Sequence, residues 1–106
     1  MAVARQESVQ PHDKNQDLIR AVSKGDLGEV TRLLESGADV NGRDRFRWPA
    51  LVRAAERGDL GLVKVLLDKG ADVNTKDEND RTALKIAQEK GFEEVVALLR
   101  ARDAKE

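Results

Sequence analysis

The sequence contains no cysteine, and this absence excludes disulfide bonds, thiolate metal ligands and a cysteine nucleophile. Aromatic residues are also scarce, at 3% of the chain. A sheet-dominated fold would need more of the aromatic and β-branched residues that strands favour. With 37% charged residues and many alanines, leucines and valines, the composition instead favours helices with solvated outer faces.

The sequence also lacks a long apolar stretch. No segment approaches the roughly 20 apolar residues of a membrane-spanning helix, and the N-terminal part lacks the apolar stretch of a secretory signal. The net charge is −1, so no overall field attracts the chain to nucleic acid or to an anionic membrane. We therefore expect a soluble, cytoplasmic protein that does not bind membranes.

Groups that could support catalysis are few. The single histidine, His12, lies in residues 1–14, which show no apolar periodicity and which we expect to form a flexible tail. Asp77, Glu78 and Asp80 cluster, but they lack the glycine and the distal glutamate of a calcium-binding loop. There is no glycine-rich phosphate loop either. We expect no enzyme activity, no cofactor and no metal ion.

One pentapeptide occurs twice. GADVN occupies residues 37–41 and 70–74, and 70 minus 37 gives a period of 33 residues, which is typical of repeat proteins. We expect the short polar side chains of both copies, Asp and Asn, to shape turns by bonding nearby backbone groups. Five columns keep one residue type over three copies at this period: Leu18, Leu51 and Leu84; Ala21, Ala54 and Ala87; Gly25, Gly58 and Gly91; Val30, Val63 and Val96; and Leu33, Leu66 and Leu99.

Within each copy the apolar residues fall on helical faces. Leu18 and Ala21 lie on one face of a first helix that Gly25 ends. Asp26 is in position to cap a second helix, which Gly37 ends. Helices this short are not stable alone in water. We therefore predict helix-turn-helix units that stack on one another, with small alanines in the first helices and leucines filling the layer between units.

The strings GDLGEVTRLLESGADVN and GDLGLVKVLLDKGADVN resemble ankyrin repeats. The resemblance implies an all-α repeat fold, a solenoid in which each pair of antiparallel helices is followed by a β-hairpin-like finger loop. It also implies non-catalytic binding of other macromolecules along the fingers and the first helices. It divides the chain into a flexible tail at 1–14, repeats at about 15–42, 43–75 and 76–101, and a C-terminal tail at 102–106.

The sequence departs from the family pattern at several positions. The family's Thr-Pro-Leu-His stretch is replaced at residues 49–52 and 82–85, so its histidine ties are absent. Arg47 and Asp80 stand where a fingertip glycine is usual. Because a positive φ is costly for arginine, we expect an altered turn in the finger that holds Arg47. Phe92 replaces a capping aspartate, and we expect it to cover the exposed end of the stack.

Residues 43–57 are notably basic, with five arginines against two acidic residues, and they hold two of the three aromatic residues, Phe46 and Trp48. The alternation from Arg45 to Trp48 predicts an extended finger with the aromatics on one face and the arginines on the other. An exposed cluster of tryptophan, phenylalanine and arginine is typical of binding hot spots. The alternative is that Trp48 covers the N-termini of the first helices and Phe46 packs on a neighbouring finger.

We expect the chain to act as a monomer that binds another protein carrying an acidic and apolar patch. Two alternatives remain: nucleic-acid binding through residues 43–57, where nearby acidic residues would repel phosphates, and a ligand-free or designed scaffold. Mapping the family's contact positions onto this sequence, with Arg47 added from the basic segment, predicts these partner-binding residues: Ser23, Lys24, Arg45, Phe46, Arg47, Trp48, Glu56, Arg57, Glu78, Asn79, Arg81, Glu89 and Lys90.

Overall fold

The computed structural model describes residues 14–44, 46–102 and 104, and these residues form six helices. Predictions that fall on residues 1–13, on Arg45 and on part of 102–106 lie outside the described residues. The helices are α2 (Lys14–Lys24), α3 (Leu27–Glu35), α4 (Ala50–Arg57), α5 (Leu60–Asp68), α6 (Ala83–Lys90) and α7 (Glu93–Ala101).

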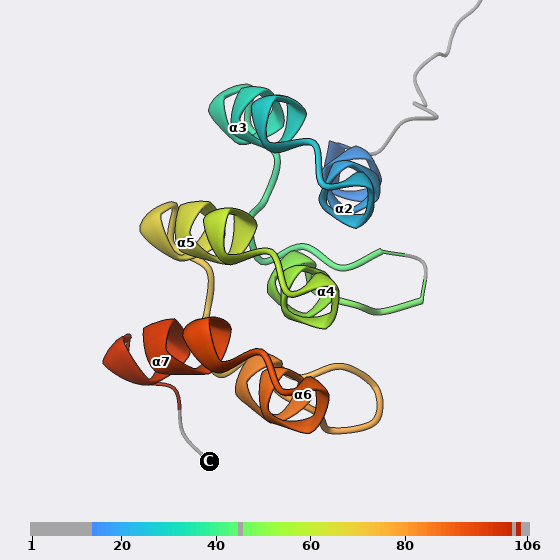
Figure 1. Ribbon diagram of the computed structural model, residues 1–106. Coiled ribbons are helices and arrows are strands. Elements are labelled where there is room, and N and C mark those ends of the chain that lie inside the picture. Colours follow the sequence, from blue (N-terminus) through green and yellow to red (C-terminus); the bar gives the residue numbers. More distant parts are fainter. Residues whose placement is uncertain (1–13, 45, 103, 105–106) are drawn as a thin grey trace, which may run out of the picture.

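The helices form three stacked pairs, as the 33-residue period predicts. Figure 1 shows α2, α4 and α6 in one row, here called the inner row, and α3, α5 and α7 in a second, outer row. Two loops project beside the inner row (Figure 1): the first finger, residues 43–49, and the second finger, residues 76–82. Each finger is closed by a single antiparallel β-bridge, between Arg43 and Pro49 and between Lys76 and Thr82.

The helices begin and end at the caps and glycines of the sequence. Asp26 and Asp59 each accept a hydrogen bond at 3.1 Å from the backbone N–H three residues later, and so cap α3 and α5. Gly58 and Gly91 end α4 and α6 with left-handed φ values of 75° and 77°, which glycine adopts without steric cost. Helices of eight to eleven residues are marginal alone, so their stability comes from packing between pairs.

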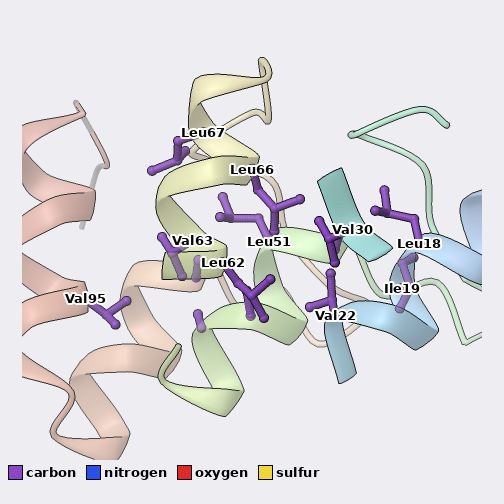
Figure 2. Close-up of a cluster of buried hydrophobic side chains, with 14 of the residues drawn as sticks. Leu18, Ile19, Val22, Val30, Leu51, Leu62, Val63, Leu66, Leu67 and Val95 are labelled. Atoms are coloured by element: carbon purple, nitrogen blue, oxygen red, sulfur yellow. The ribbon is translucent and has the colours of Figure 1, made fainter. Parts of the chain in front are cut away.

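One apolar layer runs through all three pairs. Figure 2 shows Leu18 of α2, Leu51 of α4 and Leu66 of α5 lying between the helices. Each is at most 1% exposed, and burial of such a side chain stabilises the fold by about 2 kcal/mol. Ala54 and Ala87 are fully buried in the inner row, where their small size lets α4 and α6 approach closely.

Asparagine side chains tie the turns of neighbouring units together. Asn41 Oδ1 accepts a hydrogen bond from Asp72 N at 2.7 Å, while its Nδ2 donates to the Gly70 carbonyl at 3.3 Å. Within the turns themselves, Asn41 N donates to Asp39 Oδ1 and Asn74 N donates to Asp72 Oδ1, both at 2.9 Å. The predicted turn-shaping role of these polar residues is confirmed, and Asn41 in addition bridges two repeats.

The first helix pair carries charge at positions where the second pair is apolar. Asp17 and Glu29 occupy the columns of Ala50 and Leu62, which are fully buried. The side chains of Asp17 and Glu29 are 30% and 40% exposed and pair with arginines on their own helices. The side of this pair that carries Asp17 and Glu29 is therefore suited to contact with water.

The predicted position of Phe92 is wrong. Its ring does not cover the exposed end but lies against Gly58, in the turn between α4 and α5, because a Cβ atom at Gly58 would come within 2.7 Å of Phe92 Cε2. Arg57 lies in the same way against Gly25 one layer earlier. These turn glycines therefore also provide room for a side chain of the next layer. No described residue occupies the corresponding space at Gly91.

Two described residues of the predicted C-terminal tail contact the fold. Arg102 Nη2 donates a hydrogen bond to Asp68 Oδ1 at 2.7 Å, which joins the end of α7 to the end of α5. Ala104 packs partly buried against the apolar core. These contacts extend the described fold slightly beyond α7.

Candidate partner-binding surface

The first finger is built around Asp44. Its Oδ1 accepts hydrogen bonds from Phe46 N at 2.8 Å and Trp48 N at 3.0 Å, and its carbonyl accepts one from Arg47 N at 2.8 Å. These bonds bend the chain into a tight turn in which Arg47 has a φ of 63°. The predicted extended alternation of aromatics and arginines is therefore wrong, because an extended strand requires a negative φ at every position.

The second finger contains the same turn. Asp77 Oδ1 accepts from Asn79 N at 2.8 Å and Arg81 N at 3.0 Å, and Asp80 N donates to the Asp77 carbonyl at 3.1 Å with a φ of 66°. The altered turn expected at Arg47 is not found. The carboxylate at the start of each finger accepts the same turn hydrogen bonds, although one tip holds Arg47 and the other Asp80.

Trp48 is half-buried and contacts two guanidinium groups. The Cζ atom of Arg53, in α4, lies 4.1 Å from the ring centre, and that of Arg81, in the second finger, lies 5.4 Å from it. The indole thus joins its own finger to α4 and to the next finger through cation–π contacts. This packing is closer to the alternative in which Trp48 covers neighbouring elements, and its contact with a partner stays a prediction.

Two exposed side chains of the first finger, Phe46 and Arg47, lie at its tip. Phe46 is 60% exposed, and the Arg47 side chain is 76% exposed. Arg47 Nε lies 3.8 Å from Glu78 Oε2 of the second finger, a loose surface pair that contributes little to stability. Arg45, which is predicted to act beside them, lies outside the described residues.

Two adjoining hollows lie between α2, the first finger and α4, and together they form what we call the α2–α4 groove. Their volumes are about 230 and 280 Å³, and both are lined by Ser23 and Arg53. Phe46 borders the first hollow from the fingertip. The other polar residues of the lining are Gln16, Arg20 and Asp44 in the first hollow and Glu56 and Arg57 in the second.

The protein itself orients the arginines of the groove. Arg53 Nη2 donates to Asp44 Oδ2 at 3.2 Å, and Arg53 Nη1 lies 3.8 Å from Glu56 Oε1. Arg53 Nε is buried without a hydrogen-bond partner among the described residues. Arg57 Nη1 donates to the Ser23 carbonyl at 3.1 Å while its side chain stays 45% exposed. A guanidinium has five N–H donors, so the exposed Arg57 keeps donors for a ligand.

The groove brings together only part of the predicted partner-binding residues. Ser23, Phe46, Glu56 and Arg57 line it, from three elements that are well separated in the sequence. Five other predicted residues are exposed but do not line it: Lys24, Glu78, Asn79, Glu89 and Lys90.

Two arginines of the groove, Arg20 and Arg53, are absent from the sequence-based prediction. They are 33 residues apart and so occupy one column of the repeat, whose third member is the buried Ile86. A buried layer would keep an apolar residue in every copy. The change from arginine in two copies to an apolar residue in the third therefore indicates that the two arginines lie on a surface.

Arg81, another predicted contact residue, is engaged in the second finger. Its Nε and Nη2 lie 3.0 and 2.9 Å from Asp77 Oδ2, and the Asp77 side chain is fully buried. Burial alone would raise the pKa of Asp77. Hydrogen bonds from the backbone N–H of Arg81 and Asn79 and from the Arg81 guanidinium outweigh that effect and hold the pKa below the ordinary value of 3.8.

Residues 14–44, 46–102 and 104 offer neither a cluster of metal ligands nor a membrane-spanning helix. Within these ranges, no group of three or more His, Cys, Asp or Glu side chains is placed to hold a metal ion. Nor does any helix in this part of the chain have the length and apolar character needed to cross a membrane.

Comparison with known proteins identifies the repeats. A family profile described as ankyrin repeats, in three copies, matches residues 18–105. The match covers most of α2 and all of the other five helices. A search of curated proteins found no match. The resemblance and the all-α repeat fold predicted from the sequence are confirmed.

Proposed function

Because the chain belongs to the ankyrin repeat family, we propose that it is a non-catalytic module that binds one partner protein through the inner row and the two fingers. Ankyrin repeats generally mediate protein–protein contacts. Stacked helix pairs give a largely preformed surface, and a preformed surface lowers the entropic cost of binding.

Phe46 is the observation that carries this proposal. It is 60% exposed at the tip of the first finger, beside a groove that contains three arginines. A large apolar group beside arginines has the composition of a binding hot spot. The other large apolar side chains exposed in the described part of the chain, Leu27 and Leu60, begin the outer helices α3 and α5.

A protein partner is favoured over nucleic acid because the basic segment uses its arginines internally. Arg43 Nη1 donates to the carbonyls of Arg47 at 2.9 Å and Lys76 at 2.6 Å, and so joins the two fingers. Arg53 is paired with Asp44. The segment therefore does not present a continuous row of cations to a phosphate chain. An acidic and apolar patch on a protein suits it better.

Capture from a lysate of the source cells tests the proposal. The full chain, Phe46→Ala and Leu60→Ala are immobilised in equal amounts, and Leu60→Ala removes a comparable exposed apolar group from the outer row. We expect at least one protein that the unmodified chain and Leu60→Ala retain equally and that Phe46→Ala retains roughly tenfold less, as for a hot-spot residue. Equal melting temperatures of the three chains exclude unfolding as the cause.

Two outcomes would contradict the proposal. Equal capture of every protein by Phe46→Ala and Leu60→Ala would show that the fingertip is not a contact site. Retention of nucleic acid in place of protein, with binding that falls steeply as salt rises, would favour the nucleic-acid alternative.

A further inference from the structure

The inner and outer rows differ in charge. Helices α2, α4 and α6 together hold seven basic and three acidic residues, whereas α3, α5 and α7 hold three basic and five acidic residues. The inner row is therefore net positive by four, and the outer row is net negative by two. Such a division directs an anionic ligand toward the inner row, although the chain as a whole is nearly neutral.

Within the inner row, the arginines gather at the α2–α4 groove. Arg20 reaches it from α2, and Arg53 and Arg57 reach it from α4. Arg53 and Arg57 are oriented by contacts within the protein, because Arg53 Nη2 donates to Asp44 Oδ2 and Arg57 Nη1 donates to the Ser23 carbonyl. Arginines held in this way suit carboxylates, because the planar guanidinium forms short, directional and often bidentate hydrogen bonds with them.

We infer that the α2–α4 groove takes an extended acidic segment of the partner protein. Its carboxylates bind Arg20, Arg53 and Arg57, and an apolar side chain of the segment packs on Phe46 at the groove's edge. The inference rests on the proposed function, and it adds the chemistry of the partner and the place where that chemistry is recognised.

Separate carboxylates suit this groove better than a phosphate chain does. Asp44 and Glu56 line it beside Arg53, so a continuous polyanion would be repelled at both positions. In an extended peptide, successive side chains point to opposite sides, so acidic residues can meet the arginines while neighbouring residues face away.

The third repeat does not continue the basic path. Ile86 occupies the column of the two arginines Arg20 and Arg53, and the second finger presents Glu78 and Asp80 at its tip. The bound segment is therefore short and confined to α2, the first finger and α4.

An NMR titration of the ¹⁵N-labelled full chain tests the inference. The probe is a short capped peptide of glutamates interrupted by leucines, and the control peptide has glutamine in place of each glutamate. We expect the glutamate peptide to shift the backbone signals of Ser23, Phe46 and Arg57 and the side-chain Nε–H signals of the groove arginines. The glutamine peptide should bind roughly tenfold more weakly, because it cannot form the charge-assisted bonds.

Ser23 provides a matched pair of variants, because it is exposed where the two hollows meet. Ser23→Glu adds a negative charge there, and Ser23→Gln adds nearly the same volume without the charge. We expect Ser23→Glu to weaken peptide binding by roughly tenfold and Ser23→Gln to change it by less than about threefold, since repulsion between like charges is the main difference. A second pair of variants removes one positive charge from each row: Arg57→Gln from the inner row and Arg100→Gln from the outer row. Only Arg57→Gln should weaken peptide binding.

Several results would overturn the inference. These are equal binding of the two peptides, shifts centred on the outer row, or equal affinity of Ser23→Glu and Ser23→Gln. A thymidine oligonucleotide that binds the same residues more tightly than the peptide would assign the groove to nucleic acid. If the peptide fails to bind while Phe46→Ala still loses a captured protein, only this inference falls. If the peptide binds and the capture result fails, the proposed function falls and the groove chemistry stands.

Discussion

The two fingers share one backbone turn but use their aspartates differently. In the second finger, Asp77 binds the turn through one oxygen and Arg81 of the same finger through the other. In the first finger, Trp48 takes the place of Arg81 in the repeat, and the second oxygen of Asp44 binds Arg53 of α4 instead. One finger is thus stabilised within itself, and the other is joined to the inner row.

This difference accounts for the position of the proposed binding surface. Because Asp44 binds Arg53, and both Arg53 and Arg81 contact the Trp48 ring, the first finger, α4 and the second finger form one connected unit. The unit places Phe46 beside the α2–α4 groove. The second finger has no comparable exposed apolar group among its described residues, 76–82. The finger of the proposed site therefore differs from the other finger by one redirected ion pair, while the turn stays the same.

The largest effect is expected from removing the two aspartates. Asp77→Ala should lower the free energy of unfolding by about 3 kcal/mol, because it removes two turn bonds and leaves a partly buried guanidinium without its partner. Asp44→Ala should cost about 2 kcal/mol, because the bond from Arg53 is longer, at 3.2 Å, and Arg53 keeps a neighbour in Glu56. Urea unfolding measures both.

Asp77→Asn separates the two contributions of the carboxylate. It keeps an oxygen for the turn bonds but removes the charge that faces Arg81, so its cost should fall between zero and that of Asp77→Ala. If Asp77→Ala and Asp44→Ala lowered the free energy of unfolding equally, the Asp77–Arg81 pair within the second finger would stabilise the fold no more than the Asp44–Arg53 pair, which joins a finger to a helix.

Lowering the pH is expected to have a smaller effect on the free energy of unfolding. The pKa of Asp77 is held below the ordinary 3.8, so in this acidic range the folded state binds its proton less readily than the unfolded state does. The stabilisation by this group is therefore complete above that value and is lost as the pH falls through the lower, folded-state pKa. Urea unfolding of the unmodified chain and Asp77→Asn from about pH 6 to pH 2 should show the two stabilities converging below about pH 4. A constant difference across the series would contradict the assignment.

The stack could be predicted from the sequence because each layer buries the same residue types, which then recur every 33 residues. The turn of the first finger could not, because it depends on hydrogen bonds to Asp44 that outweigh the intrinsic preference of Arg47. The α2–α4 groove could be predicted from the sequence only in part. Arg20 and Arg53 share a visible column, but the place of Phe46 beside them depends on how the finger folds.

The smallest effect is expected from the fingertips. Arg47 and Asp80 both have a left-handed φ, 63° and 66°, and this conformation costs a typical side chain about 1 kcal/mol, but aspartate less. Arg47→Gly should therefore stabilise the fold by about 0.5 kcal/mol, since the greater unfolded-state entropy of glycine offsets part of the relief. Asp80→Gly should change stability by less than that. Arg47→Ala is the control, because it loses the loose Glu78 pair yet keeps the strained backbone. If Arg47→Gly proved no more stable than Arg47→Ala in urea, the first fingertip would carry no strain, and the two tips would differ only in the side chains they present to a partner.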